Sequence, residues 1–376
     1  MTPSSTTDSQ TADRSPIDLR DPGELLAATP HLLGFDPVDS LVLVGHRGTT
    51  GARIGNIVRA DLPQPGDEAA LARQLLGPLA HDSVAVTAVV VGGRRGDATG
   101  PPARTVVTAV REVFGQAGLP VSHALWVPKI RAGAPWRCYE QSCCAGHLPD
   151  PASTVMAAVS AHAGLVTHSS RAAMERQLQP VASDVLERRA AMLRRRLSAA
   201  SRDDVASLRR GRAAVRTVLA RAWKGTLLLS DTEVVELAVA LAQPRIRDAC
   251  LATALPADSA GAVTAERLWL LLTKHTPTPE RAQPATLLAY SAYVRGEGAL
   301  AGMALDAAQA ADPNHLLSKL LRQALGHGLP PEKLVGLATS CDEEPIWTAP
   351  EDRTPPSPCS PHDSARPSTG PPAGDG

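Results

Sequence analysis

Three of the chain's six cysteines fall within a short stretch that ends in a histidine: Cys138, Cys143, Cys144 and His147. Closely spaced thiolates and imidazoles are the ligands that zinc takes in a tetrahedral site. However, adjacent residues of an extended chain point to opposite sides, so Cys143 and Cys144 are poor partners on one ion. The two CxxC-like pairs typical of structural zinc sites are also missing. The spacing indicates a zinc-type site with an irregular ligand set.

Two other interpretations of these cysteines stay open. Cysteine is among the most buried residue types, so the thiols can pack as small apolar groups under Trp136. A redox or disulfide role is the third interpretation, although disulfides are rare in cytoplasmic proteins. We favour packing and keep metal binding, with zinc as the candidate cofactor, as the main alternative.

A second group of candidate residues is a series of arginines at seven-residue spacing. On helices this spacing would line up one basic face, able to meet phosphates or an acidic partner. The alternative is a solvated face whose long side chains cover neighbouring leucines. Trp223 is the one aromatic residue of the region, which disfavours stacking on nucleic-acid bases. The arginines are Arg188, Arg195, Arg202, Arg209 and Arg216.

The composition excludes several classes of protein. Lysine and arginine together number 38, as do aspartate and glutamate, so the net charge does not call for nucleic acid or acidic lipid. Residues 1–16 lack the apolar core of a signal peptide, and apolar runs such as 268–272 are far shorter than the roughly 18 residues of a membrane span. We expect a soluble, cytoplasmic protein without a membrane partner.

The first half of the chain predicts an α/β domain over residues 17–180. Asp21 can cap a helix that Gly34 ends, and residues 40–45 and 52–62 flank a turn as in a hairpin. The continuous apolar run 83–93 is typical of a strand buried on both faces, and a helix and a further strand follow it. These units predict a mixed, partly parallel sheet covered by helices, with the cysteines on a loop after its last strand.

The second half predicts an all-helical domain over residues 181–341. Ser230 and Glu233 have the spacing of a capping box. Gly296 ends one helix, and Ala301, Leu305 and Ala308 of the next have the small–large–small spacing of a tetratricopeptide-like hairpin. The ends differ in composition. Residues 1–16 are too polar to bury, and residues 342–376 form a proline-rich tail, so we expect both to be disordered.

The chain resembles a known protein family over about residues 17–340. The resemblance rests on Gly34-Phe35-x-Pro37-x-x-Ser40-Leu41-Val42 and on the grouping of Trp136, Cys138, Cys143 and Cys144. These motifs resemble those of the family called domain of unknown function 4192, which is found mainly in actinobacteria. The resemblance implies no activity.

The residues favour a non-enzymatic interaction module that binds a protein partner through its helical half. We find no GxSxG, HExxH or paired-carboxylate motif, and the Gly-rich stretch 89–107 has neither GxGxxG nor GxxxxGK[ST]. Two alternatives stay open: a metal-binding enzyme or ligand-binding domain built on the Cys/His group, and a nucleic-acid-associated protein using the arginines of residues 187–221. The sequence does not decide whether the protein is an enzyme.

Overall fold

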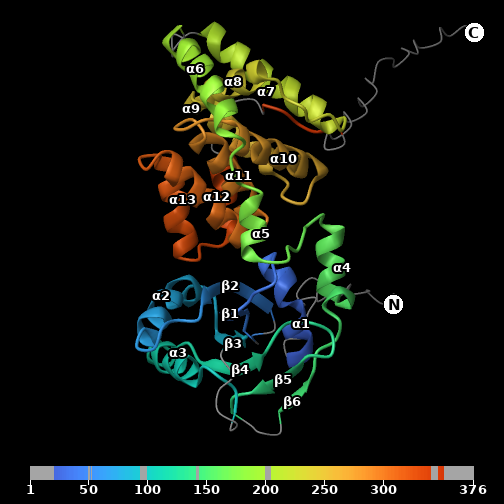
Figure 1. Cartoon of the computed structure of the whole chain (residues 1–376), viewed down its shortest axis with the longest axis vertical. Coiled ribbons are helices and arrows are strands. Elements are labelled where there is room, and N and C mark those ends of the chain that lie inside the picture. Colours follow the sequence, from blue (N-terminus) through green and yellow to red (C-terminus); the bar gives the residue numbers. More distant parts are fainter. Residues whose placement is uncertain are drawn as a thin grey trace, which may run out of the picture.

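The computed structural model describes residues 21–49, 51, 53–93, 100–140, 144–199, 205–339 and 346–350. Figure 1 shows a part built on one β-sheet and, stacked along the long axis of the molecule, a part made of helices. We call residues 21–180 the α/β half and residues 181–350 the helical half. Their independence as separate domains stays a prediction.

The α/β half contains a six-stranded sheet with the strand order β2-β1-β3-β4-β5-β6. β3 and β4 run parallel, and the other neighbouring strands run antiparallel, so the predicted mixed, partly parallel sheet is confirmed. The strands are β1 (Ser40–Arg47), β2 (Arg53–Asp61), β3 (Ala85–Val91), β4 (Val121–Val127), β5 (Pro135–Cys138) and β6 (Ala145–His147).

Helices cover both faces of this sheet. One apolar cluster joins the sheet to α2 and α3, and a second cluster joins the opposite face to α1. The central strand β3 is therefore buried along almost all of its length, which explains its unbroken apolar sequence. The three covering helices are α1 (Pro22–Leu33), α2 (Glu68–Ala80) and α3 (Arg104–Gln116).

The ends of α1 follow the local signals of its sequence. Asp21 Oδ1 accepts hydrogen bonds from the backbone N–H groups of Gly23, at 2.8 Å, and Glu24, at 3.3 Å. Gly34 ends the helix with φ = 78°, the left-handed conformation that glycine adopts without strain. The predicted cap and stop of this helix are confirmed.

Every described regular element after residue 181 is a helix, as predicted. The capping box of α8 is present, because Ser230 Oγ accepts from Glu233 N–H and Ser230 N–H donates to Glu233 Oε2. The remaining helices are η1 (Pro151–Ser153), α4 (Val155–His162), α5 (Arg171–Arg176), α6 (Ser183–Ala199), α7 (Val205–Trp223), α8 (Asp231–Leu241), α9 (Pro244–Leu251), η2 (Ala252–Ala254), α10 (Ala260–His275), α11 (Ala282–Val294), α12 (Gly298–Ala311), α13 (Leu316–Gly326) and α14 (Pro331–Thr339).

α11 and α12 form the predicted helical hairpin. Gly296 makes the turn between them with φ = 86°, and Ala301, Leu305 and Ala308 of α12 are fully buried. The small side chains at 301 and 308 allow close approach of the neighbouring helices. The tetratricopeptide-like character of the pair stays a prediction.

Residues 346–350 pack against the helical half, although they lie inside the segment that the sequence predicts to be a disordered tail. Ile346 is fully buried, its carbonyl oxygen accepts a hydrogen bond from Arg216 Nε, and Trp347 lies 6.1 Å from Trp223, ring centroid to ring centroid. The physical reason is that this short segment holds large apolar side chains, which the rest of the predicted tail lacks.

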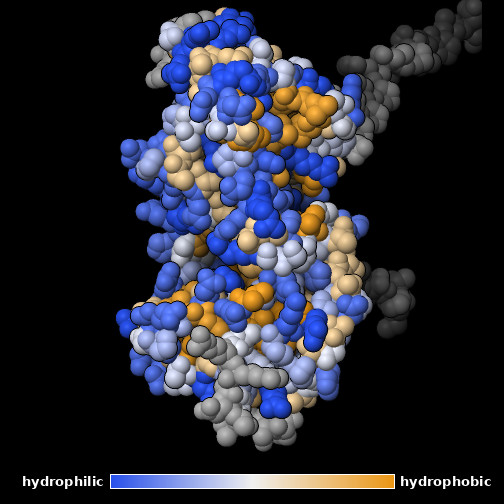
Figure 2. All heavy atoms as spheres, viewed as in Figure 1, coloured by the Kyte–Doolittle hydropathy of each residue, from blue (hydrophilic) through white to orange (hydrophobic). Residues whose placement is uncertain are grey.

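The largest apolar cluster is continuous between the two halves. It begins on one face of the sheet, passes through α1 and reaches the cores of α10, α11 and α12. Figure 2 shows hydrophobic atoms at the level of the sheet and α1 and also over the upper right of the helical half, near α7, with many hydrophilic atoms between the two groups. No helix in the described ranges has the length and apolarity that a bilayer crossing requires.

Candidate functional site

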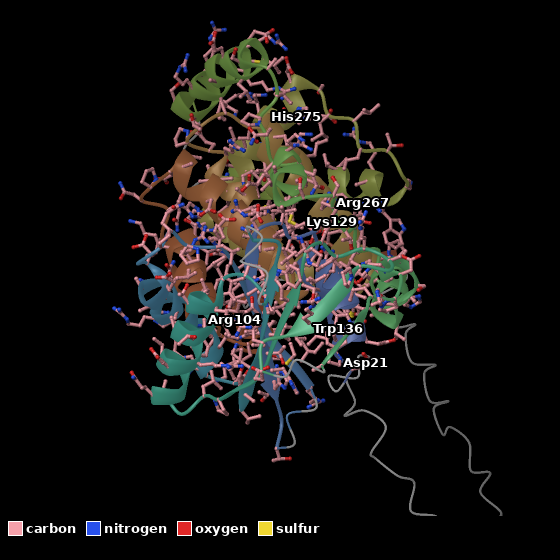
Figure 3. All side chains as sticks on the ribbon, turned by 60° about the horizontal axis from the view of Figure 1, so that its bottom comes forward. Asp21, Arg104, Lys129, Trp136, Arg267 and His275 are labelled. Atoms are coloured by element: carbon pink, nitrogen blue, oxygen red, sulfur yellow. The ribbon has the colours of Figure 1, made fainter. Side chains whose placement is uncertain are left out.

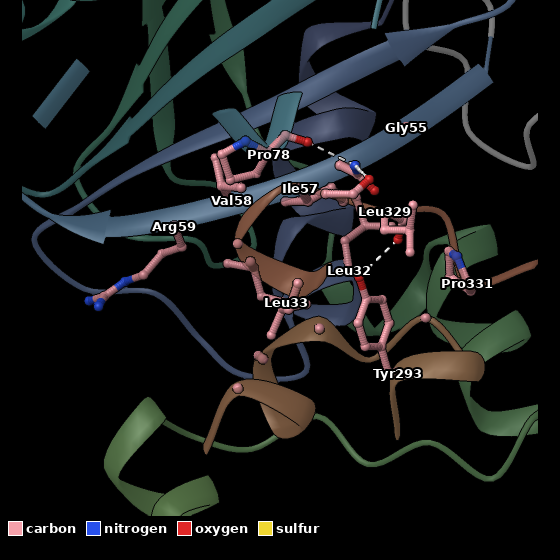
Figure 4. Close-up of a pocket in the computed structure, with 18 of the residues that line it drawn as sticks. Leu32, Leu33, Gly55, Ile57, Val58, Arg59, Pro78, Tyr293, Leu329 and Pro331 are labelled. Atoms are coloured by element: carbon pink, nitrogen blue, oxygen red, sulfur yellow. Dashed lines mark hydrogen bonds between the residues drawn. The ribbon is translucent and has the colours of Figure 1, made fainter. Parts of the chain in front are cut away.

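A cleft of about 660 Å³ lies between the α/β half and the helical half (Figure 4). This volume is within the usual range of ligand-binding pockets, and such pockets often form where two parts of a protein meet. Its walls come from β2, from the end of α1, from α2 and from α12 and α13 with the turns beside them.

The edge strand β2 forms one wall of the cleft. Residues 55–59, five in succession, line the cavity. Since successive side chains of a strand point to opposite faces of the sheet, a run of consecutive residues indicates that the edge of the strand faces the cavity. β2 is the last strand of the sheet, and among the described residues only β1 hydrogen-bonds to the backbone of residues 54–60. The cleft therefore exposes an unpaired strand edge.

Glycines on one face of α12 keep the opposite wall open. Gly298, Gly302 and Asp306 follow one another at four-residue spacing, so they lie on the same side of the helix and line the cleft. A Cβ atom built on Gly302 would have Arg322 Nη1 and Leu325 Cδ2 as its nearest neighbours, at 3.6 and 3.7 Å. Both belong to α13, and these distances are ordinary van der Waals contacts, so a Cβ atom fits at this position of the cleft wall without a clash.

Asn56 closes one end of the cleft by joining the two halves. Its Nδ2 donates to the carbonyl oxygens of Pro78, at 2.8 Å, and Gly328, at 2.9 Å. Tyr293 Oη donates to Leu329 O at 2.9 Å, which fixes the same turn between α13 and α14 (Figure 4). These bonds hold the turn against the end of α2.

The charged residues of the cleft are mainly arginines. Four arginines and two carboxylates, Asp306 and Glu332, belong to its lining, so arginines are in excess by two. Each arginine has a carboxylate partner, and such partly exposed pairs contribute about 0–1 kcal/mol each. The pairs are Arg47–Asp82, Arg59–Asp61, Arg171–Glu175 and Arg322–Asp306.

Among the described residues of the lining, the side chains that commonly exchange a proton are the carboxylates of Asp306 and Glu332 and the phenol of Tyr293. The hydroxyl of Tyr293 donates a hydrogen bond to Leu329 O, and burial raises the pKa of this phenol to about 12. The phenol therefore stays protonated at neutral pH.

A buried ion-pair group supports the turn that carries Gly296. Arg295 Nη2 lies 2.7 Å from Glu266 Oε1 of α10 and also pairs with Glu297. Burial raises the pKa of Glu266 to about 7, although Arg295 acts in the opposite direction. The proton is thus bound more tightly in the folded chain than in the unfolded chain, where a glutamate titrates near 4.5. Glu266 contributes stability below that pH, and this contribution is lost as the pH rises through about 7.

We expect the free energy of unfolding to depend on Glu266 between pH ~5 and ~7. The wild type should lose up to about 1.4 kcal/mol per pH unit relative to Glu266→Gln, whose amide does not titrate. Urea denaturation at a series of pH values measures this difference. Parallel profiles for the two proteins would contradict it.

The structure brings two of the predicted metal ligands together and separates a third. Cys138 and Cys144 face each other across the β5–β6 hairpin, where Cys138 N–H donates to Cys144 O at 2.9 Å. His147 is opposite Pro135 and three residues from Cys144, so strand alternation places it on the other, exposed face. Cys143 lies outside the described residues. The zinc site stays a prediction, and within the described ranges no three Cys, His, Asp or Glu side chains form a metal-binding group.

Cys138 and Cys144 lie on a hairpin of two short strands, where the sequence predicted a loop. Cys138 is the last residue of β5, and Cys144 directly precedes β6. Both thiols are half-buried and pack against the apolar cluster that contains Trp136, as the packing interpretation expects. Trp136 fills the space between β6 and the start of α1 near Asp21 (Figure 3). The hairpin was missed because its two strands are only four and three residues long.

The arginine series is divided between two helices. The described members lie on α6 (Arg188, Arg195) and on α7 (Arg209, Arg216), and Arg202 lies outside the described residues. α6 and α7 each pack against α8. Arg188 pairs with Asp231 at 2.7 Å, and Arg216 donates to Ile346 O at 3.1 Å, so two of these side chains have structural partners. Binding of nucleic acid or an acidic protein by the arginines stays a prediction.

Arg189, which adjoins the arginine series, is almost fully buried. Its Nε donates to Asp231 Oδ1 at 2.8 Å, and its Nη1 donates to His275 O at 2.9 Å. The side chain therefore joins α6 to α8 and to the end of α10, where His275 lies (Figure 3). Burial and the neighbouring guanidinium lower the pKa of His275. The contact between Asn56 and Gly328 could not be predicted, because no local sequence pattern indicates a contact between residues so far apart in the chain.

Comparison with known proteins gives one match. A family model described as Domain of unknown function (DUF4192) matches residues 22–332, a range that includes every residue lining the cleft. No curated protein and no solved structure matches the chain. Because the model covers most of the chain, from α1 to the first turn of α14, the protein belongs to the DUF4192 family.

Proposed function

We propose that this protein is a non-enzymatic interaction module that holds an extended segment of a partner protein in the cleft, along the outer edge of β2. The observation that carries the proposal is the run of five consecutive β2 residues, 55–59, in the lining of the cleft. Unpaired N–H and C=O groups of an edge strand bind a second strand through main-chain hydrogen bonds. The partner segment would become a seventh strand of the sheet.

The dimensions of the two walls agree with such an occupant. Residues 55–59 of β2 span about 13 Å at ~3.3 Å per residue. The α12 face from Gly298 to Asp306 spans about 12 Å at ~1.5 Å per residue. An extended segment of four or five residues therefore fits between them, and the glycines of α12 leave room for its backbone.

The lining also suggests the composition of the partner segment. Leu33, Ile57 and Met303 offer apolar contacts, which suit an apolar or small residue at the centre of the segment.

Peptide selection followed by hydrogen exchange tests this function. Random linear peptides displayed on phage are selected on the full-length protein, and amide exchange is then measured with and without the best peptide. We expect slower exchange at alternate amides of residues 54–60, because only outward-facing N–H groups gain a partner. Protection confined to α6 and α7, with β2 unchanged, would refute the proposal and favour the arginine surface.

A further inference from the structure

We propose that Cys138 and Cys144 form a reversible disulfide across the β5–β6 hairpin when the protein meets a peroxide. This inference is independent of the cleft. It rests on the positions of the two residues in the antiparallel ladder, where Arg137 pairs with Ala145 and Cys138 N–H donates to Cys144 O. Cys138 and Cys144 are therefore the next opposed pair along the same ladder.

Opposed residues of an antiparallel ladder have the geometry that a disulfide requires. Their side chains point to the same face of the sheet, and their Cα atoms are typically about 4.5–5.5 Å apart. This separation falls within the roughly 4.4–6.8 Å that disulfides span.

The surroundings of Cys138 leave its thiol open to a small oxidant. Both residues are present as thiols and are half-buried, so a small oxidant has access to them. Cys138 Sγ donates to Glu140 Oε2 at 2.6 Å, and Glu140 also pairs with Arg111 of α3. The guanidinium of Arg111 offsets the negative charge of this carboxylate and so reduces its repulsion of a thiolate at Cys138.

The reaction balances with peroxide as the sole oxidant. Cys138 sulfur attacks one peroxide oxygen, the O–O bond breaks, and the leaving hydroxide takes a proton to become water, which leaves a sulfenic acid. Cys144 sulfur then attacks Cys138 sulfur, the S–O bond breaks, and a second water leaves. Two thiols and one hydrogen peroxide give one disulfide and two waters, and two electrons pass from sulfur to oxygen.

The bond would add a covalent link at one edge of the sheet. β6 has only three residues, and among the described strands it pairs with β5 alone, so few main-chain hydrogen bonds hold it. A disulfide between Cys138 and Cys144 would link the end of β5 covalently to the residue before β6, so that β6 could not separate from β5. It also removes the thiol that donates to Glu140.

Mass spectrometry of the full-length protein after treatment with hydrogen peroxide tests the inference. We expect the wild type to lose the mass of two hydrogen atoms, and peptide mapping should place the new bond between Cys138 and Cys144. Dithiothreitol should restore the original mass. Cys143→Ser should still form the bond, whereas Cys144→Ser should not. After oxidation, the β6 amides of the wild type should exchange more slowly, and those of Cys144→Ser should not.

Cys250 provides an internal control, because it is only 1% exposed and burial raises the pKa of its thiol. It should react with a thiol reagent only after unfolding. Three results would overturn the proposal: a bond that includes Cys143, a sulfinic acid on a single cysteine without a disulfide, or a stoichiometric zinc ion on the thiols of the isolated protein.

Discussion

Replacing Gly302 with leucine should weaken peptide binding in the cleft at least tenfold and leave the fold at least as stable. The leucine side chain would occupy part of the cleft that Gly302 lines, and the atoms nearest its Cβ, on α13, lie at ordinary contact distances. Glycine within a helix costs about 0.5–1 kcal/mol relative to alanine, and leucine is nearly as good a helix former as alanine. Fluorescence polarisation with a phage-selected peptide measures the affinity, and urea denaturation measures the free energy of unfolding.

Gly115→Leu is the matched control for this experiment. Gly115 lies in α3, is exposed, and has nothing within 4 Å of a built Cβ atom. The substitution adds the same side chain to a helix that does not line the cleft, so peptide affinity should not change. If Gly302→Leu binds the peptide as tightly as the wild type, the partner segment does not occupy the space beside α12.

Replacing Gly328 with alanine should destabilise the junction between the halves by about 2–5 kcal/mol, from backbone strain and overpacking together. Gly328 has φ = 65°, and a Cβ atom there would lie 2.0 Å from Pro78 O and 2.7 Å from Asn56 Nδ2. The turn would have to move away from α2, and the hydrogen bond from Asn56 to Gly328 O would break. Urea denaturation of both proteins measures the difference in the free energy of unfolding.

Gly164→Ala separates the two causes of this loss. Gly164 has φ = 70°, close to that of Gly328, but nothing lies within 4 Å of its built Cβ atom. Alanine at this position pays only the backbone strain of about 1–2 kcal/mol. Equal losses in the two variants would show that close packing of the turn against Pro78 does not stabilise the junction.

Much of the fold could be predicted because its signals are local. Asp21 and Gly34 mark the ends of α1 through their own capping and backbone preferences, and the apolar run of β3 follows from cover on both faces. The Ser230 capping box and the α11–α12 turn at Gly296 likewise depend on residues close together in the chain. Each of these features is set by a few neighbouring residues, which a sequence pattern can detect.

The arrangement of the candidate site residues was harder to predict, since the spacing of residues along the chain does not fix the directions in which their side chains point. The cysteines and His147 are near neighbours in sequence, yet strand alternation sends Cys144 and His147 to opposite faces of the hairpin. The seven-residue spacing of the arginines suggested one basic face, but the series passes from α6 to α7, and part of it pairs with Asp231 and Ile346.

The sequence by itself determined the mixed sheet, the helical second half, the ends of several helices and the family resemblance. Only the tertiary structure reveals the cleft, because one of its walls is β2 near residue 57 and another is α12 near residue 302. Nothing in either segment specifies the other. An edge strand is defined by the strand that is missing beside it, and the role of a helical glycine depends on the element it faces. Such relations arise only when the whole chain has packed.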